Sequence, residues 1–295
     1  MKKIDLHIHS TFSDGELTPR EILDYCSNNN INTIAITDHE NFLESYEASK
    51  IISNYPDLKF ISGIEIEAEH PSQSLHILGY GFSYESKKLN DLSNAIMFDR
   101  KRFAKSLVHE LYKYYGFSFK DEDLEVLFNM KGSLGKPHIA KLCVKYGYIS
   151  SVKEAFKVHF KFLKGKTIKK EVIPTAQECI DAIKEAGGIV SLAHPITLKL
   201  NETELFDYIK TLANFGIESV EVYNSSMSKE YSSMLIKYTN KLRLLQSGGS
   251  DYHGPIVKPN IEIGRGLNDN IDIRELSILS RLWGNLYDEK CRVIC

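Results

Sequence analysis

Short apolar runs rich in β-branched residues recur along the chain, and this pattern restricts the possible folds more than any other. There are seven: KKIDLHIH, INTIAITDH, KFISGIEIE, LHILGYGF, GIVSLAHP, IESVEVYN and LRLLQSGGSD. Helical patterns lie between several of them, as in PREILDYCSNNN after the first run. Strands that alternate with helices predict a largely parallel sheet. The expected fold class is therefore α/β, and seven strands favour a closed or nearly closed barrel.

A region of different character interrupts this pattern from about residue 92 to residue 174. It contains the long amphipathic segment LSNAIMFDRKRFAKSLVHELYKYYG, which predicts a helix ending at Gly116, and Pro137 suits the first turn of another helix. The alternating pattern returns at TAQECIDAIKEAGG, where Thr175 and Glu178 form a predicted capping box. We therefore divide the chain into barrel segments 1–91 and 175–295 and a helical insertion, 92–174.

Composition and charge exclude several classes of protein. The chain has 295 residues, of which 42% are hydrophobic and 26% charged, as in ordinary globular domains. Its net charge of -2 provides no overall field to attract double-stranded DNA or a membrane. The five cysteines lack paired spacing, the N-terminus MKKIDLHIHS lacks the apolar part of a signal peptide, and no apolar run could span a bilayer. We expect a cytoplasmic protein with a local anion site.

Nearly every predicted strand carries metal-binding side chains at or near its end: His7 and His9, Asp38 and His39, Glu65, His76, His194, and Asp251 with His253. The carboxyl ends of parallel strands share one face of a barrel, so these groups should converge. His7 and His9 lie two residues apart, so both imidazoles can reach one ion. Asp14 precedes Gly15, where a turn can return it to the strand. Asp5 lies on the same face, where it could orient a histidine.

The ordered motifs HIH, SDG, TDH, GIE, LHILGY, AHP and GSDYH resemble the PHP family, named for polymerase and histidinol phosphatase. The resemblance implies a distorted (βα)7 barrel with an inserted helical subdomain, up to three divalent ions and hydrolysis of phosphate esters. It selects Glu65, which follows Gly63, although Glu67 and Glu69 share its strand face. It also implies three ligand sets, with Glu65 bridging two ions: His7, His9, Glu65 and Asp251; Asp14, His39 and His253; Glu65, His76 and His194.

Such a centre needs no side chain as nucleophile. Imidazole and carboxylate ligands favour Mn, Fe or Zn, and we expect two or three ions. Bound cations lower the pKa of water, so the expected nucleophile is a metal-bridging hydroxide. His194 and His253 are candidates for proton transfer. Asp38 is expected behind the ligands, where it orients His39 or caps the next turn.

The motifs GKPHIAK, YGYISSVKEAF and AGGIVSLAHP extend the resemblance to a PHP subgroup. That subgroup acts on nucleoside 3′,5′-bisphosphates or trims short RNAs from the 5′ end, and it usually carries arginine at the position of Lys136. Lys136 and His138 flank Pro137 at a predicted helix start, which is a natural anion site. We expect this pair to bind the phosphate that is not cleaved, although Lys136 could also be an ordinary solvated lysine.

The predicted activity is hydrolysis of phosphate monoesters in nucleoside 3′,5′-bisphosphates, extending to short RNA with a 5′-phosphate. Two alternatives stay open: a phosphatase for histidinol phosphate or a sugar phosphate, and a non-catalytic PHP metal-binding module. Other polar and aromatic residues receive structural interpretations. Arg100, Lys101 and Arg102 could face a polyanion, but we assign them to a solvated helix face. Phe156, Phe160 and Phe162 are assigned to packing in preference to a platform for base stacking. Glu221 and Asn224 close the sixth strand, where they could line the cavity, but the sequence assigns them no role.

Overall fold

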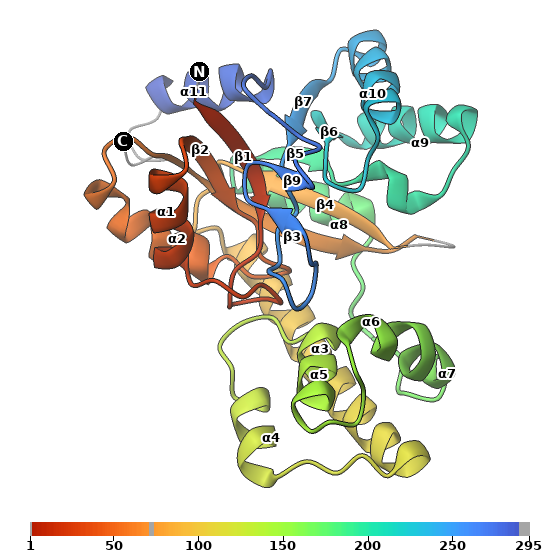
Figure 1. Ribbon diagram of the computed structural model, residues 1–295. Coiled ribbons are helices and arrows are strands. Elements are labelled where there is room, and N and C mark those ends of the chain that lie inside the picture. The colour runs from red at the N-terminus through yellow and green to blue at the C-terminus, as the bar shows by residue number, and fades with distance from the viewer. Residues whose placement is uncertain (1, 71–73, 289–295) are drawn as a thin grey trace.

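The computed structural model describes residues 2–70 and 74–288 and contains one seven-stranded sheet whose strands follow in sequence order (Figure 1). The strands are β1 (Lys3–Ile8), β2 (Ile31–Ile36), β3 (Lys59–Ala68), β4 (Leu75–Tyr80), β5 (Ile189–Leu192), β6 (Ser219–Tyr223) and β7 (Leu245–Gly248). Each coincides with one of the predicted apolar runs, although β3 extends one residue beyond its run, to Ala68. The predicted α/β fold class is therefore confirmed.

One strand departs from the expected parallel arrangement. β4 pairs antiparallel with both β3 and β5, whereas the other neighbouring strands pair in parallel. Only residues 69–74 join β3 to β4, and a connection of this length is too short for a parallel crossover, so the pair is antiparallel. The reversal places the beginning of β4 at the rim where the other strands end.

The two edges of the sheet meet at this same rim. The backbone N–H of His9 donates to the carbonyl of Tyr252 at 2.9 Å, and the N–H of Asp251 donates to the carbonyl of His7 at 2.8 Å. Ile8 and Tyr252 form a parallel bridge between the same two segments. The segment after β7 thus joins β1, which gives the nearly closed barrel that the sequence predicted.

Helices pack against the outer face of the sheet (Figure 1). They are α1 (Pro19–Asn28), α2 (Leu43–Ile51), η1 (Ile52–Asn54), α8 (Ala176–Glu185), η3 (Pro195–Leu198), α9 (Glu202–Phe215) and α10 (Lys229–Leu242). α11 (Ile278–Asp288) packs instead in another apolar cluster, which includes Leu6, Ile61 and Tyr80. The predicted capping box of α8 is present, with Thr175 and Glu178 bonded in both directions. A short hairpin of β8 (Ile261–Glu262) and β9 (Gly266–Leu267) follows β7. No helix in residues 2–70 and 74–288 is both long and apolar enough to cross a bilayer.

Most of the segment between β4 and α8 forms a helical lobe below the barrel in Figure 1, while the first part of α3 packs in the barrel core through Leu89 and Ile96. The segment contains α3 (Lys87–Tyr115), α4 (Asp121–Phe128), α5 (Lys136–Lys145), α6 (Val152–Glu154), the π-helical turn η2 (Ala155–His159) and α7 (Phe160–Leu163). The lobe has its own apolar core, which includes Leu107, Leu111 and Ile139. α3 ends at Gly116 as predicted, with a left-handed φ of 69°, but it begins at Lys87, before residue 92. The division at residues 92 and 174 stays a prediction.

Candidate metal centre

The structure brings the nine predicted metal ligands together at the carboxyl rim of the barrel. Three lie within strands, namely His7, Glu65 and His76. The other six lie in segments that follow strands: His9, Asp14, His39, His194, Asp251 and His253. Seven of the nine are buried, and His39 and His76 are partly exposed. His76 reaches the rim because β4 is reversed, so that a residue near the start of this strand meets residues at the ends of its neighbours.

The first predicted ligand set surrounds one point. The Nε2 atoms of His7 and His9 lie 3.2 Å apart. Glu65 Oε2 lies 3.4 Å from the first of these nitrogens and 3.2 Å from the second. Asp251 Oδ1 lies 3.5 Å from His7 Nε2 and 3.4 Å from His9 Nε2. Two ring nitrogens and two carboxylate oxygens therefore face one another across a gap that a cation could occupy.

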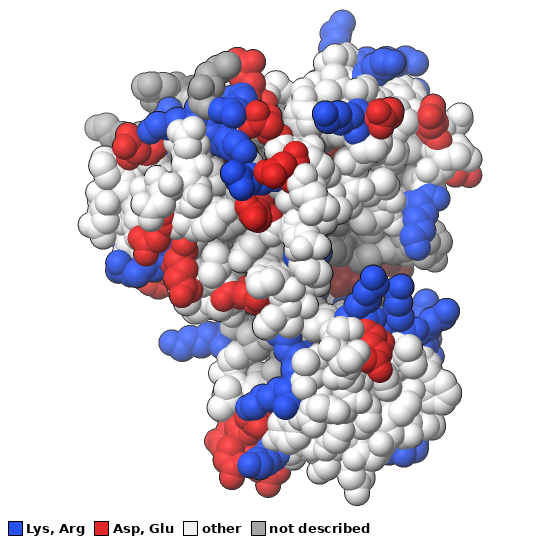
Figure 2. Space-filling model, viewed as in Figure 1, with Lys and Arg blue, Asp and Glu red and all other residues white. Residues whose placement is uncertain are grey.

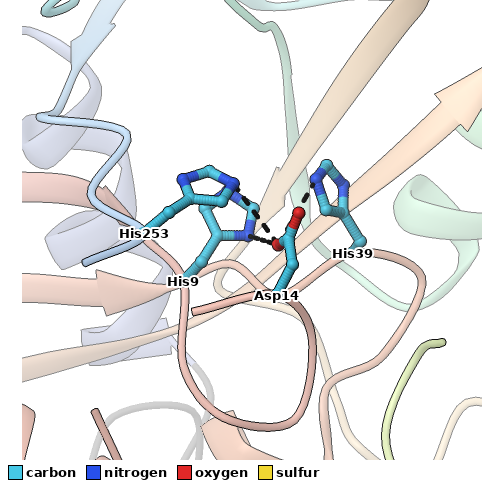
Figure 3. A group of neighbouring side chains, drawn as sticks. All are labelled: His9, Asp14, His39 and His253. Atoms are coloured by element: carbon cyan, nitrogen blue, oxygen red, sulfur yellow. Dashed lines mark ion pairs between the residues drawn. The ribbon is translucent and has the colours of Figure 1, made fainter. Parts of the chain in front are cut away.

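The second set gathers around Asp14, as Figure 3 shows. Its Oδ1 atom lies 3.3 Å from His253 Nε2, 3.8 Å from His9 Nδ1 and 3.9 Å from His39 Nε2. His9 thus stands between the first and second sets. The return of Asp14 toward His9 depends on Gly15, where a Cβ atom would lie 2.3 Å from the carbonyl oxygen of His9.

Glu65 occupies the bridging position that the family resemblance implies. Its Oε1 atom lies 2.9 Å from His76 Nδ1 and 2.8 Å from His194 Nε2, while Oε2 faces the first set. His39 Nδ1 also lies 3.1 Å from Oε2, so His39 approaches Glu65 as well as Asp14. The residues can be grouped in more than one way, and the assignment of each ligand to a particular ion stays a prediction.

Contacts outside the cluster decide which nitrogen of each ring faces inward. His7 Nδ1 lies 2.8 Å from Glu221 Oε1, and His253 Nδ1 lies 2.9 Å from the carbonyl of Asp251. Both partners only accept hydrogen bonds, so the neutral rings donate from Nδ1 and leave Nε2 without a proton. Such a nitrogen is the form that binds a metal ion.

In three further rings, a hydroxyl group determines which nitrogen carries the proton. Ser13 donates to Asp38 and therefore accepts from His9 Nδ1, which lies 3.3 Å from the hydroxyl. Thr197 donates to the carbonyl of His194 and accepts from Nδ1 of the same ring at 3.2 Å. Ser74 donates to Glu67 and accepts from His76 Nε2 at 2.9 Å. In each ring, the nitrogen that faces Glu65 is then the unprotonated one.

This arrangement fits bound cations. Unprotonated nitrogens that face carboxylate oxygens repel them unless positive charge lies between the two. Asp14 Oδ1, His39 Nδ1 and Glu65 Oε2 are buried and have no hydrogen-bond partner in the described parts of the chain. Burial disfavours a charged His9, but the carboxylates of Asp251 and Glu65 outweigh it and raise the pKa of His9 to about 9. The cluster therefore attracts positive charge, which divalent ions can supply.

Backbone strain also marks the rim. His194 has a φ of 23° and Asp251 a φ of 55°, in the left-handed region that residues other than glycine adopt rarely. Both follow the ends of strands and turn their side chains toward Glu65 and His7. Strained conformations of this kind persist where the surrounding structure fixes them, most often at functional sites.

The two predicted supporting carboxylates have roles that differ from those expected. Asp38 contacts Ser10 and Ser13 and thereby supports His9, not His39. Asp5 accepts hydrogen bonds from the backbone N–H groups of His7, Ser250 and Gly264, at 3.2, 2.9 and 2.7 Å. It therefore joins β1 to the chain after β7 and does not orient a histidine ring. A polar residue two positions before a ligand does not reveal which atoms it will contact.

A cavity of about 940 Å³ opens from the metal centre toward the helical lobe. Asp14, His39, His76 and His253 line its floor, and Lys136 and Arg100 line its wall. His138 is not among the residues that line it, and its Nδ1 atom accepts from the N–H of Gly135 at 3.1 Å. Of the predicted pair, only Lys136 therefore faces the cavity.

Sequence reasoning assigned no role at this site to three polar residues. Glu221 holds the ring of His7 and accepts from the backbone N–H of His194 at 2.6 Å. Lys258 lines the cavity, and its Nζ atom lies 2.5 Å from Asp251 Oδ2. Arg100 is mostly buried against Glu40 and Glu67, at 2.8 and 3.2 Å, so its assignment to a solvated face was wrong. Of the three, only Glu221 had a sequence signal, because it lies near the end of a predicted strand.

Comparison with known proteins agrees with this geometry. A family model described as the PHP domain matches residues 5–259. A 5′-3′ exoribonuclease from Haemophilus influenzae is 29% identical over 269 residues, which cover 90% of this chain and 95% of that protein. A 3′,5′-nucleoside bisphosphate phosphatase from Chromobacterium violaceum is 24% identical over 255 residues, which cover 86% and 88% of the two chains.

A solved structure of similar sequence has the same fold and belongs to the predicted enzyme class. A candidate metal-dependent phosphoesterase from Bifidobacterium adolescentis superposes with a TM-score of 0.80 at 27% identity, over 90% of this chain and 92% of that one. The predicted class, a metal-dependent phosphoesterase, is confirmed by these likenesses. The match to the family model spans both barrel segments and the insertion between them, and the chain belongs to the PHP domain family.

Proposed function

We propose that this phosphoesterase hydrolyses phosphate monoesters of nucleotides that carry a second phosphate, as in nucleoside 3′,5′-bisphosphates, and that it also accepts short RNA with a 5′-phosphate. The observation that carries the proposal is the cavity, in which the metal-ligand cluster and a cationic wall from the helical lobe face the same space. One phosphate can lie at the ligand cluster while another contacts the wall. The names of the Haemophilus and Chromobacterium relatives agree with both substrate types.

The nine clustered side chains would hold two or three divalent ions, of Mn, Fe or Zn. When bound, such ions polarise phosphate oxygens and lower the pKa of water. Glu65 would lie between ions because its two oxygens face different histidines. His194 and His253 each use Nδ1 in a hydrogen bond and direct Nε2 at a carboxylate. We therefore assign both to metal binding, with no nitrogen left for proton transfer.

The cationic wall would bind the phosphate that is not cleaved. Lys136 lies over the ring of Phe103, 5.6 Å from its centroid, and no acidic side chain in the described residues is within 4.0 Å of its Nζ atom. Arg100 and Lys170, in contrast, already neutralise Glu67. Lys136 is therefore more available to a phosphate than Arg100 or Lys170.

The test compares substrates that share a cleavable phosphate but differ in the second one. The purified protein, loaded in turn with Mn, Fe and Zn, is assayed on a nucleoside 3′,5′-bisphosphate, a 5′-phosphorylated oligonucleotide, histidinol phosphate and an aryl phosphate. We expect Lys136→Ala to raise KM for the bisphosphate by roughly tenfold, as for the loss of one charged contact, and to change aryl phosphate hydrolysis little. Lys229→Ala, on α10, is the matched control.

The alternative functions predict other results. Preference for histidinol phosphate over the bisphosphate would support the first alternative. Tight metal binding without turnover of any substrate would indicate a non-catalytic module. Equal losses on bisphosphate and aryl phosphate in the Lys136 variant would contradict the role of the wall.

A further inference from the structure

A second cavity adjoins the first on the helical lobe. It has a volume of about 540 Å³ and shares Glu67, Phe103, Lys136, Phe156 and Lys170 with the first cavity. Because these residues line both spaces, the second cavity continues the path that leads away from the metal centre. A nucleoside bisphosphate at the centre does not require this additional space.

Lysines are concentrated along this path. Residues 153–170, which we call the lysine segment, contain seven lysines and one acidic residue, Glu154, in a chain of net charge -2. Lys153 and Lys157 line the first cavity, Lys161, Lys164 and Lys169 line the second, and Lys170 lines both. Figure 2 shows basic side chains gathered on the lobe where α6 and α7 approach the barrel.

Most of these charges are available to a ligand. Among the described residues, no carboxylate lies within 4.0 Å of Lys161, Lys164 or Lys169, and all three are exposed. Glu67, the acid shared by the two cavities, is already neutralised by Lys170 at 2.6 Å and Arg100 at 3.2 Å. Burial and the neighbouring Lys170, Arg100 and Lys164 together lower the pKa of Lys136, which reflects mutual repulsion between crowded cations.

Aromatic side chains alternate with the lysines. Phe156 packs against Phe160, and Phe162 packs against Tyr114 and Tyr115, as the sequence predicted. Phe156 and Phe162 nevertheless stay 40% and 51% exposed, whereas Phe160 is buried. Phe156 lines both cavities, and Lys166 lies 4.7 Å from the centroid of the Phe162 ring. Exposed rings beside cations are the combination that binds single-stranded nucleic acid through base stacking and phosphate contacts.

We propose that the second cavity and the lysine segment bind the backbone of a single-stranded oligonucleotide whose 5′-phosphate lies at the metal centre. This inference rests on the proposed function, because the position of the chain end at the metal centre follows from phosphate hydrolysis there. It adds a surface for the nucleotides that follow the first one. The lysines contact phosphates, and the exposed phenylalanines contact bases without selecting a sequence.

The chemistry of the surface favours this ligand over other polyanions. An acidic peptide would use the lysines but would place no planar groups against Phe156 and Phe162. A membrane surface would need a flat cationic face, whereas these lysines surround a cavity that continues into an active site. A phosphodiester chain matches the charge, the rings and the connection to the metal centre.

The experiment measures binding of RNA that carries phosphorothioate both at its 5′ end and at every linkage, which slows hydrolysis at all of these positions, to the full-length metal-loaded protein by fluorescence anisotropy. Oligonucleotides of two and eight residues are compared for the unmodified protein and for a triple variant, Lys161→Gln, Lys164→Gln and Lys169→Gln. The control variant, Lys229→Gln, Lys237→Gln and Lys241→Gln, removes the same charge from exposed positions on α10. DNA oligonucleotides of the same sequence identify which sugar is preferred.

We expect the unmodified protein to bind the longer oligonucleotide more tightly than the shorter one. In the triple variant, the ratio of the two affinities should fall by roughly tenfold. The slope of log Kd against log salt concentration should fall by about 2 in the triple variant, for three lost phosphate contacts. The control variant should retain both the gain and the slope. A lysine-dependent gain with either sugar supports the proposal.

The inference is overturned if the longer oligonucleotide binds no more tightly than the shorter one, or if both triple variants lose affinity equally. Turnover separates this failure from that of the proposed function. Hydrolysis of a nucleoside bisphosphate without a length-dependent gain refutes only the oligonucleotide surface. A length-dependent gain without hydrolysis of any phosphate ester retains the surface and refutes the phosphoesterase function.

Discussion

His7 shows how one contact outside the cluster decides what an imidazole can bind. Glu221 accepts from Nδ1, so the other ring nitrogen is unprotonated and faces Glu65 and Asp251. The second oxygen of Glu221 accepts from the N–H of His194 at 2.6 Å and from Asn224 Nδ2 at 3.1 Å. A single carboxylate thus orients one ligand ring and positions the backbone of a second ligand.

Replacement of Glu221 by glutamine tests this role without changing the size of the side chain. If the glutamine NH₂ group faces His7 Nδ1, that nitrogen must accept, and the ring proton moves to Nε2, where the metal should bind. If the NH₂ group faces the other way, it meets the N–H of His194 and the amide of Asn224, which are also donors. We expect metal affinity to fall by about 10–100-fold, as when partners of ligands are lost elsewhere. Metal content after dialysis measures the effect, and Glu230→Gln on the exposed start of α10 is the control. Unchanged metal affinity in a folded variant would contradict this role.

The residue scale also shows what sequence can and cannot reveal. The ligands could be predicted because each lies in or after a predicted strand and belongs to an ordered motif, as do His7 and His9. The partners of these ligands could not be predicted in the same way, because their contacts depend on atoms brought together from distant segments. Asp38 precedes His39 in sequence but supports His9 through Ser13.

At the scale of elements, the reversed strand β4 determines part of the site. The apolar pattern predicted a strand at LHILGYGF but contained nothing about its direction. The short connection from β3 requires the reversal, and this places His76 beside Glu65. A parallel β4 would have carried His76 to the opposite end of the barrel. The length of the connection therefore determines the direction of β4, and the residues of β4 themselves do not.

The connection between the helical lobe and the metal-binding loop is a second feature at this scale. Ser133 donates its N–H to the carbonyl of Phe12 at 2.7 Å, and Lys141 lies 3.2 Å from the carbonyl of Asp14. Gly132 permits this approach, because a Cβ atom there would lie 2.0 Å from the carbonyl oxygen of Phe12. The lobe is thus fixed to the loop that carries a metal ligand.

Gly132→Ala is expected to separate the lobe from this loop. Overpacking against backbone typically costs about 1–3 kcal/mol, so the free energy of unfolding should fall within that range. Turnover should fall for the aryl phosphate as well as for the bisphosphate, because Asp14 moves with its loop. Denaturant unfolding and kcat on both substrates measure these effects. Gly284→Ala is the control, since a Cβ atom in that helix meets nothing within 4 Å; a loss confined to the bisphosphate would argue against this connection.

For the whole molecule, the barrel is closed where its metal ligands meet. His7 lies near the N-terminus, and Asp251 and His253 lie in the segment that joins β1 from the other edge. Ions bound between these residues would therefore link the two ends of the folded chain. The sequence predicted the α/β fold and the place of the site, but closure depends on backbone contacts between segments more than 240 residues apart, such as His9 and Tyr252, which no local pattern encodes.

Removal of metal is therefore expected to destabilise the whole barrel. Binding to the folded state alone contributes about 2.7 kcal/mol per site at a free ion concentration of 100 times Kd. At roughly 2–4 °C for each kcal/mol in a large domain, chelation should lower Tm by about 5–10 °C for one site and more for several. Calorimetry with EDTA, followed by restoration with Mn or Zn, measures the change. In Asp14→Asn the shift should be smaller, since the second ligand set loses its carboxylate charge. Identical Tm values with and without chelator would contradict the view that cations hold the two edges of the barrel together.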